Sequence, residues 1–163
     1  MKKAQDYGTS WTVLRMTSVT DQLLIKAERI RTLEDRKVNL VGDSITGEYI
    51  GIVNYCVIAL MLHEMQASQD AKTTLLQDME SLGAAYDRMI GLAYSTLQKK
   101  NHDYGEAWRR MRISSITDLI RMKIERLKQI EDSEGKLLAS EGVDANYVDM
   151  INYAIFALIR LQE

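Results

Sequence analysis

Apolar residues recur at helical spacing along most of the chain. Between residues 73 and 100 they stand at positions 75, 79, 82, 86, 89, 93 and 97, an alternating three-four spacing typical of an amphipathic helix. Residues 18–35 and 115–132 carry a similar stripe, and residues 47–65 and 145–162 are strongly apolar. The pattern predicts a helix at each of these places.

Two parts of the chain carry nearly the same sequence. "DYGTSWTVLRMTSVTDQLLIKAERIRTLED" (6–35) aligns without gaps with "DYGEAWRRMRISSITDLIRMKIERLKQIED" (103–132), and "EYIGIVNYCVIAL" (48–60) with "NYVDMINYAIFAL" (146–158). This self-similarity indicates a tandem duplication, with copy one at 2–65 and copy two at 99–163. We predict an all-α fold: a helical bundle of two tandem, pseudo-symmetric helical hairpins joined by one long amphipathic helix at about 73–100. The whole chain, 1–163, is expected to form a single domain.

Local signals suggest where these helices begin and end. Ser-x-x-Asp at 18–21 and again at 115–118 resembles a capping box, which predicts that a helix starts at each serine. Gly8 and Gly105 close the repeated Asp-Tyr-Gly, where glycine supplies the left-handed conformation of a helix C-terminal cap. Each Asp-Tyr-Gly is therefore expected at the end of a helix.

Composition narrows the classes of function. The chain of 163 residues has no proline and a net charge of -2, which favours helices and makes nucleic acid an unlikely partner. The single Cys56 lies in an apolar run, where we expect a buried, inert thiol. The longest apolar stretch, 49–62, is shorter than the roughly 20 residues that span a bilayer. We therefore expect a cytoplasmic protein that does not enter a membrane.

Cationic residues interrupt the apolar stripe at the same place in both copies. Lys26 and Lys123 occupy the middle of the stripe, and Arg29 and Arg126 follow three residues later on nearly the same face. Long cationic side chains often extend outward from the edge of such a stripe. Because both copies keep Lys-x-x-Arg in one register, we also interpret the pairs as candidate phosphate-binding groups.

Polar residues also interrupt the apolar final helix of copy two. Asp149 and Asn152 lie one turn apart there, and a buried carboxylate needs a charge partner or a ligand. Copy one keeps Asn54 at the position of Asn152 but has Gly51 at the position of Asp149. The carboxylate either belongs to a ligand site or forms an internal lysine–aspartate pair that fixes helix register.

Other candidate residues have strong structural explanations. Trp11 and Trp108 could stack on a nucleobase, but a tryptophan beside a turn is more often a core anchor. His63 lacks a second histidine one turn on, and His102 stands alone in a polar turn. Glu125 points away from the lysine stripe, so a metal-binding role for it would need another helix to meet that face.

The ordered set Asp-Tyr-Gly-x-x-Trp, Ser-x-Thr-Asp, Lys-x-x-Arg and Asp-x-x-Asn-Tyr resembles the nucleotide modification associated domain 1 family, a bacterial and phage group of small helical proteins. The resemblance implies a link to nucleotide metabolism. In copy two it implies ligand-binding roles for a set of residues: Asp103, Tyr104, Gly105, Trp108, Lys123, Arg126, Asp149, Asn152 and Tyr153. In copy one the matching residues are Asp6, Tyr7, Gly8, Trp11, Lys26, Arg29, Asn54 and Tyr55.

The chain is also loosely similar to the all-α, MazG-like nucleoside triphosphate pyrophosphohydrolases. That family holds magnesium with Glu-x-x-Glu and Glu-x-x-Asp pairs, and this sequence departs from the pattern. Asp149-x-x-Asn152 can stand for one pair, whereas Glu48-x-x-Gly51 has lost half of its pair. If the similarity extends to the metal, the cofactor would be magnesium, with Asp149 and either Glu125 or Asp118 as candidate ligands; the sequence itself leaves the cofactor open.

Three functions remain open at this point. The chain is either a metal-dependent, pyrophosphohydrolase-like enzyme, a non-catalytic protein that binds or sequesters a nucleotide, or a structural helical module. For the first two the partner is a nucleotide or another phosphate-bearing small molecule. Nothing resembling the long central helix precedes copy one, so we also expect a homodimer that covers its apolar surface.

Overall fold

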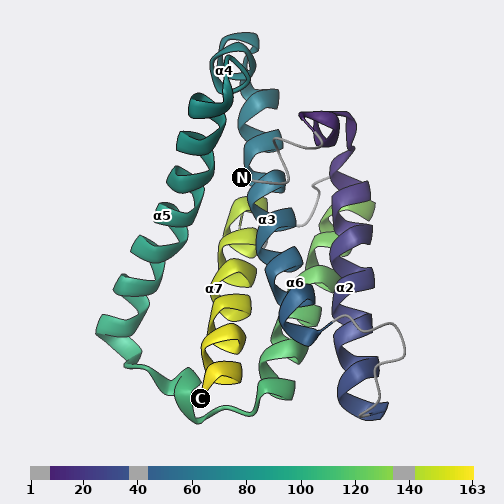
Figure 1. The fold of residues 1–163 in the computed structure, drawn as a ribbon, viewed down its shortest axis with the longest axis vertical. Coiled ribbons are helices and arrows are strands. Elements are labelled where there is room, and N and C mark those ends of the chain that lie inside the picture. The colour runs from purple at the N-terminus through teal and green to yellow at the C-terminus, as the bar shows by residue number, and fades with distance from the viewer. Residues whose placement is uncertain (1–7, 37–43, 134–141) are drawn as a thin grey trace.

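Within the residues that the computed structural model describes, 8–36, 44–133 and 142–163, the regular structure is entirely helical (Figure 1). The all-α prediction is confirmed. The long helices are α2 (Met16–Arg36), α3 (Ile45–Ala67), α5 (Met79–Tyr104), α6 (Ile113–Asp132) and α7 (Val143–Gln162). A short helix α4 (Gln69–Leu75) and two 3₁₀ turns, η1 (Ser10–Val13) and η2 (Ala107–Arg110), connect them.

The two copies form one bundle. α2 packs on α3 and α6 packs on α7, while α3 also packs on α7 and α2 on α6. α5 packs against both α3 and α7 and runs along that side of the bundle (Figure 1). α5 therefore covers the final helix of copy one as well as that of copy two. The homodimer stays a prediction.

The apolar stripe of each copy forms the core as its spacing predicted. Leu23 and Ile30 of α2 and Ile120 and Leu127 of α6 are buried, and burial of each such side chain stabilises the fold by roughly 1.5–3 kcal/mol. α3 is apolar enough to pass a length and composition test for a membrane span, but 56% of its most apolar window is buried inside the bundle. Its composition suits a central core helix.

The long central helix begins later than its apolar spacing predicted. Asp78 is the N-cap of α5 and accepts a hydrogen bond of 2.7 Å from the backbone amide of Ser81, which lowers the pKa of the Asp78 carboxyl. This cap starts a new helix at Met79, so the residues before it form the separate helix α4. At the other end, Gly105 caps α5 with φ +65°, as the second Asp-Tyr-Gly predicted.

The predicted capping boxes are wrong. α2 begins at Met16 and α6 at Ile113, so Ser18 and Ser115 lie inside the first turn rather than before it. Arg112 is the N-cap of α6 and makes no side-chain cap hydrogen bond. The capping-box spacing was therefore a coincidence of short polar residues in the first helical turn.

Candidate functional site

The acidic residue at the centre of the copy-two site is Asp149 on α7. Its side chain is only 9% exposed and contacts two ammonium groups. Nζ of Lys123 on α6 lies 2.9 Å from Oδ2, and Nζ of Lys100 on α5 lies 2.7 Å from Oδ1. The structure thus brings together Lys123 and Asp149, as the polar pattern predicted, and adds Lys100 from the central helix.

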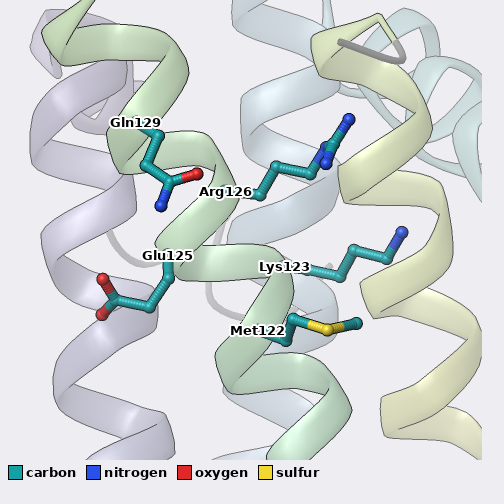
Figure 2. Close-up of a pocket in the computed structure, with 5 residues that line it drawn as sticks. All are labelled: Met122, Lys123, Glu125, Arg126 and Gln129. Carbon is teal, nitrogen blue, oxygen red and sulfur yellow. The ribbon is translucent and has the colours of Figure 1, made fainter. Parts of the chain in front are cut away.

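A hollow of about 290 Å³ lies against α6 beside this ion pair. Its described lining is made of Met122, Lys123, Glu125, Arg126 and Gln129. Figure 2 shows Lys123 and Arg126 pointing toward α7, whereas Glu125 points toward α2. The two cations of the repeated Lys-x-x-Arg therefore share one hollow and one direction.

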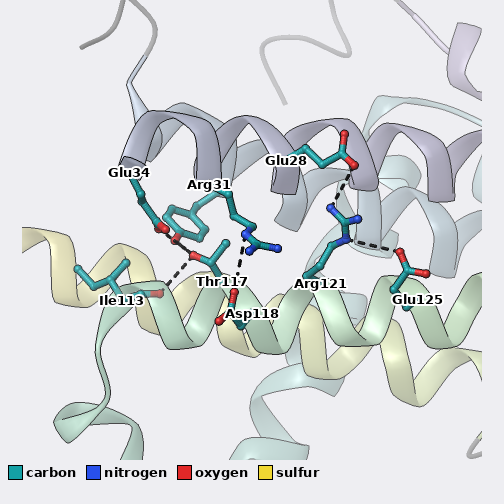
Figure 3. Close-up of polar contacts among 9 residues, drawn as sticks. Glu28, Arg31, Glu34, Ile113, Thr117, Asp118, Arg121 and Glu125 are labelled. Carbon is teal, nitrogen blue, oxygen red and sulfur yellow. Dashed lines mark hydrogen bonds and ion pairs between the residues drawn. The ribbon is translucent and has the colours of Figure 1, made fainter. Parts of the chain in front are cut away.

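The structure does not bring Glu125 and Asp149 together. Oε1 of Glu125 lies 3.5 Å from Nε of Arg121, whose Nη1 lies 3.1 Å from Glu28 of α2 (Figure 3). Asp118, the other acidic candidate for the magnesium site, lies 3.9 Å from Nε of Arg31. Among the described residues, no group of three acidic, histidine or cysteine side chains is arranged to hold a metal.

The two repeated asparagines contact α5. Nδ2 of Asn152 donates a 3.0 Å hydrogen bond to the backbone carbonyl of Ala93. Oδ1 of Asn54 accepts a 2.7 Å hydrogen bond from the hydroxyl of Tyr86. Asn152 thus links α7 to the central helix, and Asn54 links α3 to it. The described hydrogen bond of Asn152 is to α5 and not to Lys123.

Copy one forms its own ion cluster with a different acidic residue. Glu48, whose side chain is 9% exposed, lies with Oε1 3.1 Å from Nη1 of Arg29 and Oε2 3.6 Å from Nζ of Lys26. The same ammonium lies 5.6 Å from the ring centre of Tyr55. The Lys-x-x-Arg motif therefore meets a carboxylate of the final helix in both copies.

The aromatic residues of copy two pack in the core. Trp108 is 8% exposed and stacks on Phe156, with ring centres 4.3 Å apart. Cζ of Arg109 lies over the Trp108 ring, 4.4 Å from its centre. Tyr153 packs edge to face against Phe156, with ring centres 6.3 Å apart. In copy one, Trp11 is half-buried against the core. The core-anchor interpretation of the tryptophans fits this packing.

The remaining candidates lie at the surface or outside the described residues. Asp103 is exposed, and its Oδ1 lies 3.2 Å from Nδ1 of His102. The side chain of Tyr104 and the residues Asp6 and Tyr7 are not among those described.

A family comparison bears on these two clusters. A family model described as nucleotide modification associated domain 1 matches residues 3–62 and again residues 100–161. The chain belongs to this family. The two matches coincide with the two copies of the repeat, so each ion cluster lies within one matched region. No curated protein and no solved structure matches the chain, and the MazG-like similarity stays a prediction.

In this nucleotide modification associated domain 1 protein, two hydroxyl–carboxylate contacts join the copies across the α2–α6 interface. Thr117 donates to Glu34 at 3.0 Å (Figure 3), and at the equivalent position Thr20 donates to Glu131 at 2.6 Å. The oxygen of Thr117 also lies 2.5 Å from the hydroxyl of Tyr49. Burial raises the pKa of both glutamates and raises that of Tyr49 to about 12.

The sequence did not identify Glu48 as the partner of Lys26 and Arg29, or Lys100 as a partner of Asp149. The alignment contained a signal for Glu48, because this carboxylate stands on the final helix of copy one, one turn before the position that matches Asp149. No signal identified Lys100, since its contact depends on how α5 packs against α7. The structure also pairs His63 of α3 with Asp144 of α7, at 2.6 Å between Nδ1 and Oδ1.

Proposed function

We propose that this chain binds a nucleotide in copy two, with the phosphate groups held by Lys123 and Arg126. One observation carries the proposal: the two cations of the repeated motif line the same hollow and both point from α6 toward α7 (Figure 2). The family description, which associates such domains with nucleotide modification, supports a nucleotide as the source of the phosphate.

The chemistry of the lining suits this ligand. The guanidinium of Arg126 can offer a fork of donors to phosphate oxygens, and the ammonium of Lys123 adds a compact charge that Asp149 already orients. Gln129 supplies an amide with both donors and an acceptor, and Met122 supplies an adaptable apolar surface for a base or sugar. The hollow lies near the small end of the range of about 300–1,000 Å³ for ligand pockets, so a mononucleotide would remain partly exposed.

Binding without turnover is favoured over metal-dependent hydrolysis by the contacts of Asp149. Both of its carboxylate oxygens already lie within 3 Å of an ammonium group, at 2.9 and 2.7 Å. A magnesium ion at Asp149 would have to displace Lys123, Lys100 or both, and would then stand beside like charges. A structural role has its own support, because Asn54 and Asn152 fasten α5 to the bundle.

The test is a thermal-shift screen of the full chain against nucleoside mono-, di- and triphosphates, in EDTA and in magnesium, followed by chromatography of the products. We expect a nucleotide to raise the melting temperature equally in both buffers and to be recovered intact. Stabilisation that requires magnesium, together with release of pyrophosphate, would instead establish the hydrolase. No stabilisation by any nucleotide would leave only the structural module.

A further inference from the structure

A second hollow, of about 470 Å³, lies between α3, α5 and the first turn of α7. Its volume falls within the range of about 300–1,000 Å³ that ligand pockets usually have. None of its described lining residues lines the hollow beside α6. It is therefore a candidate binding site that is separate from Lys123 and Arg126.

Part of the lining of this second hollow is apolar. Leu60 of α3 and Met89 of α5 are buried, whereas Leu92 of α5 is 46% exposed. A flat ring bound there would contact the polarisable sulfur of Met89 and would remove apolar surface of Leu92 from water. Such a surface favours an aromatic ligand over a bare anion.

The polar part of the lining consists of two ion pairs, each of which joins two helices. Nδ1 of His63 lies 2.6 Å from Oδ1 of Asp144, and Nη1 of Arg88 lies 3.0 Å from both carboxylate oxygens of Glu64. The carboxylate of Asp144 holds the proton of the neutral His63 ring on Nδ1, which makes Nε2 an acceptor. Nε2 and the carboxylates suit an amino group of a ligand, and Arg88 suits a carbonyl or a ring nitrogen.

A further hollow of about 400 Å³ adjoins this one, because Glu64 and Arg88 line both. Its lining also includes Asp70 and Thr74 of α4 and Ser81 of α5. Such hydroxyl and carboxylate groups suit the hydroxyls of a sugar, as when a carboxylate binds the ribose in dinucleotide-binding folds. A phosphate group there would instead meet like charges on Glu64 and Asp70.

We propose that the two adjoining hollows form a site for an uncharged nucleoside whose base carries an exocyclic amino group. The base lies against the apolar part of the lining, with its amino group toward His63 and Asp144. The ribose lies in the hollow that Asp70 lines. This inference goes beyond the proposed function, because it uses no residue of the hollow beside α6 and the site selects a ligand without phosphate.

The test follows the methionine methyl signals of the full chain by NMR, since Met89 lines this site and Met122 lines the hollow beside α6. Met89→Leu and Met122→Leu assign the two signals. The probes are adenosine, cytidine, uridine and adenosine monophosphate, in EDTA. Adenosine or cytidine should shift the Met89 signal to saturation and leave the Met122 signal unchanged. Uridine, which lacks the amino group, and the charged monophosphate should each bind this site about tenfold more weakly.

Leu92→Glu places a charge on the apolar part of the lining without disturbing the core, because Leu92 is partly exposed. It should lower the affinity for adenosine or cytidine by about tenfold or more. The matched control is Tyr94→Glu, on the same helix at a side chain that is 60% exposed and lines neither hollow, and it should bind as the wild type does.

Equal affinity of the two glutamate variants, equal affinity of the wild type for uridine and adenosine, or a Met89 signal that no nucleoside shifts would overturn the inference. Each of these results leaves nucleotide binding in copy two intact, because Met122 reports on that site. A Met122 signal that no nucleotide shifts would count against the proposed function and not against the nucleoside site.

Discussion

Lys123 and Asp149 join α6 to α7 through a contact of 2.9 Å between Nζ and Oδ2, with both side chains nearly enclosed. The contact has two consequences that can be separated by experiment. It stabilises the hairpin of copy two, and it fixes an ammonium group at the edge of the hollow that Arg126 also lines.

Asp149→Asn separates binding from metal-dependent chemistry. The change removes the carboxylate that Lys123 and Lys100 share, so the free energy of unfolding should fall by about 1–3 kcal/mol in urea titrations. Nucleotide affinity in EDTA should be kept or should rise by about threefold to tenfold, because a negative charge beside the phosphate is lost. A metal site at Asp149 predicts the reverse, with binding or turnover abolished.

Asn152→Ala tests the attachment of α5. Loss of the hydrogen bond to the Ala93 carbonyl should lower the free energy of unfolding by about 1 kcal/mol and speed amide hydrogen exchange in α5. Tyr86→Phe, which removes the contact to Asn54, should act in the same direction. Both variants should bind nucleotide as the wild type does. A large loss of affinity in Asn152→Ala alone would place that side chain in the ligand site.

The two half-buried glutamates at the α2–α6 interface, Glu34 and Glu131, predict a pH dependence of stability. Burial raises the pKa of Glu34 and Glu131 above the ordinary value of 4.5, so the folded chain binds more protons than the unfolded chain. Their contribution to stability is therefore fully present below about pH 4.5 and is lost as the pH rises through the folded pKa values.

The double variant Glu34→Gln with Glu131→Gln tests this contribution. It keeps an acceptor for each threonine hydroxyl and cannot ionise. Compared with the wild type, it should gain stability as the pH rises from about 4 to 8, as followed by urea unfolding at each pH. Parallel stability curves for the two proteins would show that these carboxyls titrate alike in the folded and unfolded chains.

The fold followed from the sequence because its main determinant is local. The apolar stripes of α2 and α6 needed only helical periodicity, and Leu23 and Ile120 are buried as expected. The starts of α2 and α6 were predicted two residues too late, because a serine in the first turn and a serine at the N-cap look alike in a sequence. The break before α5 depends on one hydrogen bond, from Ser81 to Asp78, which apolar spacing does not reveal.

The site followed from the sequence only where a buried charge required a partner. That requirement predicted the pairing of Asp149 with a cation, and Lys123 supplies it. It did not predict Lys100, whose contact depends on the packing of α5. The sequence shows Glu48 only as the remaining half of a Glu-x-x-Asp pair. Its contacts with Arg29 and Lys26 depend on how α3 packs against α2, which the sequence pattern does not reveal.

The most direct test of the account is calorimetric titration of nucleotide in EDTA into three proteins: the wild type, Lys123→Gln/Arg126→Gln and the matched Lys26→Gln/Arg29→Gln. The paired changes remove the same charges from equivalent positions of the two copies. We predict one bound nucleotide for the wild type, an affinity reduced by about a hundredfold or more in the copy-two variant, and little change in the copy-one variant. Equal affinities for all three proteins, or equal losses in both variants, would contradict a nucleotide site in copy two.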